Sequence, residues 1–200
     1  MDTQNTYPAI DSAAKIKRFA LVLCAVAAIA IGAKIQVPFW PVPMTLQTLA
    51  IFTVAASLGL RLGVLAIFGY LALGLSGVPV FAGLGAGPLY MAGPTAGFLV
   101  GFVVMVFIIG AAKSAGWLSS PLRHFFVFVI ADVACLALGL LWLAYGFVLP
   151  STGSAMGVSA ALAVGVTPFI LGDLLKAAVG AVGIEAVTLT ARKIKARLQW

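Results

Sequence analysis

The sequence predicts an all-α integral membrane protein with six transmembrane helices in one domain. Of its 200 residues, 63% are hydrophobic and only 8% are charged, whereas soluble domains carry about 25% charged residues. The apolar runs are long and unalternated, which argues against a membrane β-barrel made of ~10-residue alternating segments. No polar stretch is long enough for a soluble domain. We expect a single membrane domain over 1–200, with a polar tail at 1–14, a helix bundle at about 19–191 and a basic tail at 192–200.

Six apolar segments define the expected helices. They run over about 19–33, 45–60, 62–75, 94–112, 125–148, and from 159 or 168 to 191. A membrane span needs ~20 apolar residues, so we expect the short second and third segments to be tilted or partly buried. Three prolines within 38–43 exclude a regular helix between the first two segments. The connection 76–93 is rich in glycine and almost uncharged.

Basic residues at the ends of the apolar segments set the expected orientation. Lys and Arg gather in the cytoplasmic loops of membrane proteins. With both termini in the cytoplasm, Lys34 is the only flanking base outside, and the connections 34–44 and 76–93 share the outer face. The net charge of +7 therefore reflects orientation in a lipid bilayer and does not indicate a nucleic-acid partner. The inner bases are Lys15, Lys17, Arg18, Arg61, Lys113, Arg123, Arg192, Lys193, Lys195 and Arg197.

The last span carries Asp173 and Lys176 inside an apolar segment. Residues three apart share one helical face, roughly 5–6 Å apart at Cβ. A charge near the bilayer interior costs at least a few kcal/mol, so this pair must face protein, water or a ligand. It is either an ion pair between helices or, since buried pairs stabilise poorly, a site for a ligand with adjacent N–H and C=O groups. At ~1.5 Å per residue, it lies roughly 8–12 Å below the outer end.

Side chains near the two outer connections are the other candidates for a ligand site. Phe39 and Trp40 stand between prolines, either as an interfacial anchor or as a flap over an apolar ligand. The Gln47 amide can both donate and accept hydrogen bonds. The glycines of 76–93 permit close backbone approach, either in a compact re-entrant connection or over a ligand. The candidate ligand-binding residues are Asp173, Lys176, Gln47, Trp40, Phe39, Phe81 and Tyr90.

Small residues recur every four positions in the first span, at Ala20, Cys24, Ala28 and Gly32. Such a stripe allows helices to approach closely in lipid. It serves either packing within this chain or docking of another membrane subunit, for which Cys24, Ala28 and Gly32 are the candidates.

Enzymatic chemistry finds little support in the sequence. Asp132 stands alone in the fifth span, as a structural or a functional carboxylate, and His124 is the only histidine. No catalytic triad, metal cluster or carboxylate pair can be assembled. We therefore expect neither a metal site nor a resident cofactor.

Four stretches resemble the BioY family, the biotin-binding substrate (S) subunits of energy-coupling-factor (ECF) vitamin transporters. They are residues 37–49, 77–83, 93–102 and 168–176, in order along most of the chain. Ala96 departs from the family's Gly-Pro-Thr-Gly-Gly, whereas the glycine after it is kept.

The resemblance implies a six-helix S-subunit fold that binds biotin near the outer face of a bacterial inner membrane. It assigns ligand binding to Asp173 and Lys176, and it matches a subunit-docking motif inexactly to Ala28 and Gly32. This chain has no ATP-binding motif, so the implied partners are a transmembrane coupling (T) subunit and two ATP-binding-cassette ATPases. The alternatives are a subunit for another vitamin and a structural or assembly membrane protein without a ligand.

Overall fold

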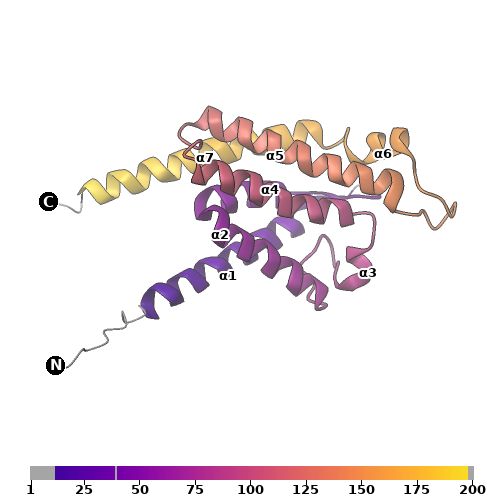
Figure 1. The fold of residues 1–200 in the computed structure, drawn as a ribbon, viewed down its shortest axis with the longest axis horizontal. Coiled ribbons are helices and arrows are strands. Elements are labelled where there is room, and N and C mark those ends of the chain that lie inside the picture. The colour runs from indigo at the N-terminus through magenta and orange to yellow at the C-terminus, as the bar shows by residue number, and fades with distance from the viewer. Residues whose placement is uncertain (1–11, 39, 198–200) are drawn as a thin grey trace, which may run out of the picture.

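The structure is a computed structural model that describes residues 12–38 and 40–197, and it is helical almost throughout (Figure 1). Its helices are α1 (Ser12–Lys34), α2 (Gln47–Leu75), α3 (Gly87–Met91), α4 (Ala96–Ser114), α5 (Pro121–Leu141), the π-helical turn η1 (Trp142–Gly146), α6 (Val158–Gly165) and α7 (Ile170–Arg197). Within the described residues, four helices are long and apolar enough to cross a membrane. The number is five if α6 and α7, bent by 46° at their break, form one span. The predicted all-helical class is confirmed.

Helix α2 reverses its direction and consists of two antiparallel halves. Gly59 lies inside it with φ 76° and ψ −176°, a conformation that only glycine adopts readily. The Gln47 amide donates to the Tyr70 hydroxyl at 2.7 Å across 23 residues, whereas 23 residues of straight helix would span ~34 Å. The two halves correspond to the two short segments predicted from the sequence, with the break at Gly59 rather than at Arg61.

A lysine from α4 caps the first half of α2. Lys113 Nζ donates to the carbonyl oxygens of Ala56 at 2.7 Å and of Ser57 at 2.5 Å. The last carbonyls of a helix have no partner within it, and a cation is favoured at this end of the helix dipole. Lys113 therefore stabilises the reversal, in addition to the orienting role that the sequence suggested.

The two ends of the bundle hold different sets of connections. Figure 1 shows that α1 begins and α7 ends at one end of the molecule. At the opposite end, Lys34 at the end of α1 donates to backbone carbonyls in the connection 76–93. Trp142, just after α5, donates to the Gly93 carbonyl at 2.8 Å. The connections 34–44 and 76–93 thus lie together, as the sequence predicted.

Small residues let α4 pack tightly between α2 and α5. A Cβ added to Gly101 would lie 2.6 Å from Cys135 Sγ of α5, and one added to Gly110 would lie 2.6 Å from Leu60 Cα of α2. These separations admit no larger side chain, and small residues at helix contacts are typical of membrane proteins. Helix α7 packs against α2 and α5, so these four helices surround a common interior.

The structure corrects the start of the fifth helix. The sequence placed a polar turn over 113–124, but α5 begins at Pro121. The Ser120 side chain accepts a hydrogen bond from the Arg123 backbone N–H, and proline at the first helical position is favourable. Ser-Pro is thus a helix-start signal that was overlooked in the sequence.

Two connections contain more regular structure than expected. The proline-rich 34–44 segment begins and ends in the strands β1 (Gln36–Val37) and β2 (Met44–Thr45), which pair antiparallel. The connection 76–93 includes the short helix α3. Both elements lie beside the mouth of the interior and help to shape the site.

Candidate functional site

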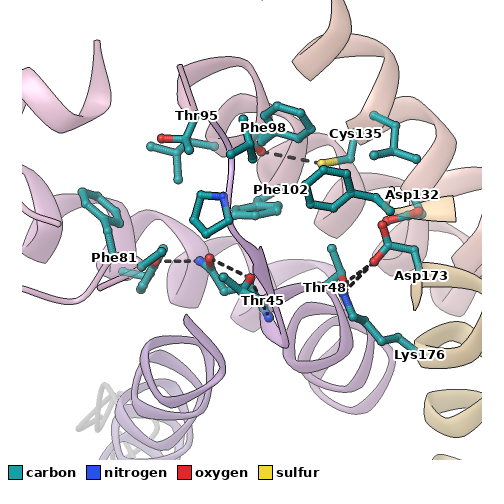
Figure 2. Close-up of a pocket in the computed structure, with 18 of the residues that line it drawn as sticks. Thr45, Thr48, Phe81, Thr95, Phe98, Phe102, Asp132, Cys135, Asp173 and Lys176 are labelled. Carbon is teal, nitrogen blue, oxygen red and sulfur yellow. Dashed lines mark hydrogen bonds and ion pairs between the residues drawn. The ribbon is translucent and has the colours of Figure 1, made fainter. Parts of the chain in front are cut away.

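A central cavity lies between α2, α4, α5 and α7, below the two connections of that end (Figure 2). About 550 Å³ of space around it is not filled by protein atoms, the open solvent at its mouth included. Phe81, Phe98, Phe102 and Phe169 make much of its wall apolar. Its polar side chains are Thr45, Gln47, Thr48, Tyr70, Tyr90, Thr95, Asp132, Asp173 and Lys176.

The predicted Asp173–Lys176 pair lines this cavity. Lys176 Nζ bonds Asp173 Oδ1 at 2.7 Å, and the Thr48 hydroxyl donates to the same oxygen at 3.2 Å. Both charged side chains are buried, with 4% and 8% of their surface exposed. Asp173 lies in the first turn of α7, where the helix dipole favours a carboxylate. The pair therefore presents an ammonium and a carboxylate in a buried setting.

Gln47 also lines the cavity, but its amide is bonded to protein groups. Besides its bond to Tyr70, its Oε1 lies 3.2 Å from the Thr45 hydroxyl, which donates to it. The Tyr70 hydroxyl donates onward to the Val80 carbonyl at 3.3 Å. This chain of hydrogen bonds links β2, both halves of α2 and the connection 76–93.

Phe81 and Tyr90 form a stacked aromatic pair on the cavity wall. Their ring centroids are 4.9 Å apart with an interplanar angle of 13°. Phe81 also meets the Tyr70 ring edge-on at 5.4 Å. Gly74 makes room for this cluster, because a Cβ there would lie 2.0 Å from Phe81 Cζ. Burial raises the pKa of the Tyr90 phenol, so this hydroxyl is neutral and able to donate.

The structure does not bring Trp40 to the cavity. Its side chain is 74% exposed and is absent from the cavity wall. An exposed tryptophan at this end of the bundle agrees with the alternative of an interfacial anchor. Phe39 lies outside the described residues.

Asp132 is the main feature of the site that sequence reasoning missed. It extends from α5 to the cavity wall near Asp173 (Figure 2), and it interacts electrostatically with Asp173 and Lys176. The expectation that no carboxylate pair can be assembled is therefore wrong. The available signal was a lone carboxylate in an apolar helix, which marks a functional site by default.

No group of three or more His, Cys, Asp or Glu side chains that could hold a metal ion exists among the residues that the structure describes. The arrangement of the site is that of a binding cavity, with hydrogen-bonding groups spread around an apolar interior.

Comparison with known proteins agrees with the fold and the four resembling stretches. The sequence model of the BioY family matches residues 4–193. This chain belongs to the BioY family. It is accordingly a multi-pass membrane protein of a transporter family, and its relatives are named as transporters rather than enzymes.

Two BioY relatives are similar over most of their length. The probable biotin transporter BioY of Pyrococcus horikoshii is 34% identical over 172 residues, which cover 86% of this chain and 96% of that protein. The biotin transporter BioY of Thermotoga maritima is 37% identical over 155 residues, which cover 78% and 86%.

A solved structure has the same fold. It is the S-component for biotin from an ECF-type ABC transporter, and it superposes with a TM-score of 0.77 at 24% sequence identity. The match covers 90% of this chain and 95% of that one. The BioY-family chain therefore has the S-component fold.

The small residues of the α1 stripe differ in their exposure in this BioY-family structure. Cys24 and Ala28 are exposed, and α1 packs chiefly against α2. Gly32 is instead buried, and a Cβ there would lie 3.0 Å from the Leu46 carbonyl oxygen. Gly32 thus serves packing within the chain, whereas Cys24 and Ala28 remain open to another subunit or to lipid.

Proposed function

We propose that this chain is the membrane subunit that captures biotin at the outer face of the cell and delivers it inward with an ATP-driven coupling module. The observation that carries the proposal is the buried Asp173–Lys176 pair on the wall of an otherwise largely apolar cavity. The ureido group of biotin has a carbonyl oxygen beside its N–H groups. Lys176 can donate to that carbonyl and Asp173 can accept from an N–H, which gives strong charge-assisted hydrogen bonds.

The far side of the cavity suits the rest of the ligand. Thr95 and Phe81 lie across the cavity from Asp173 and Lys176 (Figure 2). Aromatic rings there can cover the apolar thioether ring and chain. The buried Thr95 hydroxyl and the neutral Tyr90 phenol interact with each other on this wall, and the two hydroxyls can serve as hydrogen-bonding groups for an acidic tail. Long ligands with unlike ends are held in one direction by such a site.

The fold supports six membrane crossings with both termini in the cytoplasm. Helices α1, α4, α5 and α7 and the two halves of α2 alternate in direction along the chain. With both termini in the cytoplasm, as we propose, the connections 34–44 and 76–93 face outside, and Lys34 is the one base that the sequence analysis assigns to that side. The expected location is a bacterial inner membrane.

The proposed partners follow from what the chain itself lacks. The sequence has no ATP-binding motif, so ATP is hydrolysed by two partner ATPases, and a transmembrane coupling (T) subunit connects them to this chain. The exposed Cys24–Ala28 face of α1 is the candidate contact. Biotin is the transported substrate, and no resident cofactor is needed.

Biotin binding to the detergent-purified chain tests the proposal. A ligand that binds only the folded state stabilises it, by about 2.7 kcal/mol at 100 times its Kd, so biotin should raise the melting temperature. Other vitamins in competition test the alternative of a different substrate. A chain that neither binds biotin in a direct titration nor gains stability from it contradicts the proposal and favours a structural or assembly protein.

A further inference from the structure

Among the described residues, the cavity wall holds two carboxyl groups, those of Asp132 and Asp173, and one ammonium, that of Lys176. Asp173 Oδ1 already receives hydrogen bonds from Lys176 Nζ and from the Thr48 hydroxyl. Asp132 has 6% of its surface exposed, and its Oδ1 has no hydrogen-bond partner among the described residues. A buried acceptor without a donor is unfavourable, and one ammonium offers full charge compensation to only one carboxylate.

The protein does not supply the missing donor from the side chains nearest to Asp132 on its own helix. Cys135 lies three residues further along α5, and its thiol is directed to the Phe98 carbonyl at 3.7 Å. Leu136, the next cavity residue on that helix, has no polar side-chain atom. From α7, the Lys176 ammonium bonds Asp173. Asp132 Oδ1 is therefore available to accept a hydrogen bond from a ligand that enters the cavity.

We propose that Asp132 is a third ligand-contacting residue, whose Oδ1 accepts one N–H of a cyclic ureido group while Asp173 accepts the other N–H and Lys176 donates to the carbonyl. This inference rests on the proposed function. A cyclic ureido group carries one acceptor flanked by two donors, and its complement is one donor with two acceptors. The Asp173–Lys176 pair alone would leave one ligand N–H buried and unpaired, which is unfavourable; Asp132 completes the set.

The same arrangement predicts opposite effects on affinity and on the stability of the empty protein. Replacing Asp132 by asparagine keeps the shape of the side chain and removes a buried ionisable group, so the unliganded protein should melt at the same temperature or higher. In Asp132→Ala, which removes the acceptor, biotin binding should weaken ~10-fold or more, because a ligand N–H left buried without an acceptor costs about 1–3 kcal/mol. A structural aspartate would instead lower the melting temperature of the empty protein.

The experiment measures biotin binding and melting temperature for the purified wild-type chain, Asp132→Asn and Asp132→Ala. Glu185→Gln is the matched control, since it makes the same chemical change on α7 at a residue that lines neither the cavity nor its mouth. Two biotin derivatives, each methylated on one ureido nitrogen, serve as further probes. The methylation penalty is the loss of affinity of a derivative relative to biotin for the same protein. Asp132→Ala should reduce this penalty for one derivative and leave it unchanged for the other.

The outcomes separate this inference from the proposed function. If the wild-type chain binds biotin and the affinity is unchanged in Asp132→Asn and Asp132→Ala, then Asp132 does not contact the ligand, and the proposed function is unaffected. If Asp132→Ala binds biotin more weakly but both methylation penalties stay unchanged, then Asp132 has a structural role and the inference is overturned. Wild-type chain that does not bind biotin overturns both.

Discussion

At the scale of single residues, the Asp173–Lys176 pair has two separable effects. Each partner offsets the charge of the other in a buried setting, and both present hydrogen-bonding groups to the cavity. Removing one partner of a buried pair leaves an uncompensated charge and typically costs 3–5 kcal/mol. Replacing both residues removes the uncompensated charge and also removes the hydrogen-bonding groups that would recognise the ligand. Stability and binding therefore respond differently to single and double substitutions.

Lys176→Met should lower the melting temperature of the empty protein and weaken biotin binding by more than ~100-fold, since it strands Asp173 and removes the donor. The double variant Asp173→Asn/Lys176→Met should regain most of the stability but none of the affinity. Thermal unfolding and titration calorimetry in detergent measure both. If the double variant binds biotin as the wild type does, the pair lies outside the recognition site.

At the scale of elements, two lysines stabilise the two ends of the bundle by donating hydrogen bonds to backbone carbonyls. Lys34 Nζ donates to the carbonyls of Pro79, Phe81 and Gly83 at 2.5, 2.7 and 2.6 Å, and so ties the connection 76–93 to the end of α1. Since Phe81 lines the cavity, this bond set positions part of the ligand site. At the other end, Lys113 likewise donates to backbone carbonyls and so holds the α2 reversal in place.

Lys34→Met should accelerate biotin dissociation at least ~10-fold, because the connection that covers the cavity loses three hydrogen bonds to a charged group. Each such bond is worth about 1.5–3 kcal/mol, and ~1.4 kcal/mol already corresponds to tenfold. Association should change little. Chasing bound labelled biotin with unlabelled ligand measures the rate. Lys113→Met is the matched control, since it also removes bonds to carbonyls but far from the mouth; equal acceleration in both variants would point to general loosening instead.

The packing of Phe81 against α2 gives a second element-scale prediction. Gly74→Ala should displace the Phe81 ring, destabilise the protein by about 1–3 kcal/mol as overpacking does, and weaken biotin binding. Gly183→Ala is the control. Gly183 lies in α7, where an added Cβ would have no described atom within 4 Å beyond its chain neighbours and its own helix backbone, and alanine is the better helix former. A neutral Gly74→Ala would show that the ring moves freely and does not shape the cavity.

At the scale of the whole molecule, the sequence predicted those features that depend on one segment at a time. Apolar length and a charge in an apolar span indicated the helical class and the importance of Asp173 and Lys176. The approach of Asp132 to that pair depends on how α5 packs against α7, which no single segment encodes. The placement of Trp40 depends on the β1–β2 pairing, and proline content alone did not predict it.

The proposed orientation can be tested on the complete chain in cells. With Cys24 replaced by alanine, Leu84→Cys in the connection 76–93 should react with a membrane-impermeant maleimide added outside. Ser119→Cys, in the α4–α5 connection, should react only after the membrane is opened. Both residues are exposed, so burial does not explain a difference. The reverse pattern would invert the topology and place the cavity mouth at the cytoplasm.

The reversal at Gly59 also determines how much protein separates the cavity from the opposite end of the bundle. Thr48 lines the cavity, and eleven residues later the chain has already turned back, a distance of ~17 Å along the helix. The hydrocarbon layer of a bilayer is ~30 Å thick. A molecule held beside Thr48 therefore has only about half of that thickness left to cross before it reaches the end of the bundle at the Gly59 reversal.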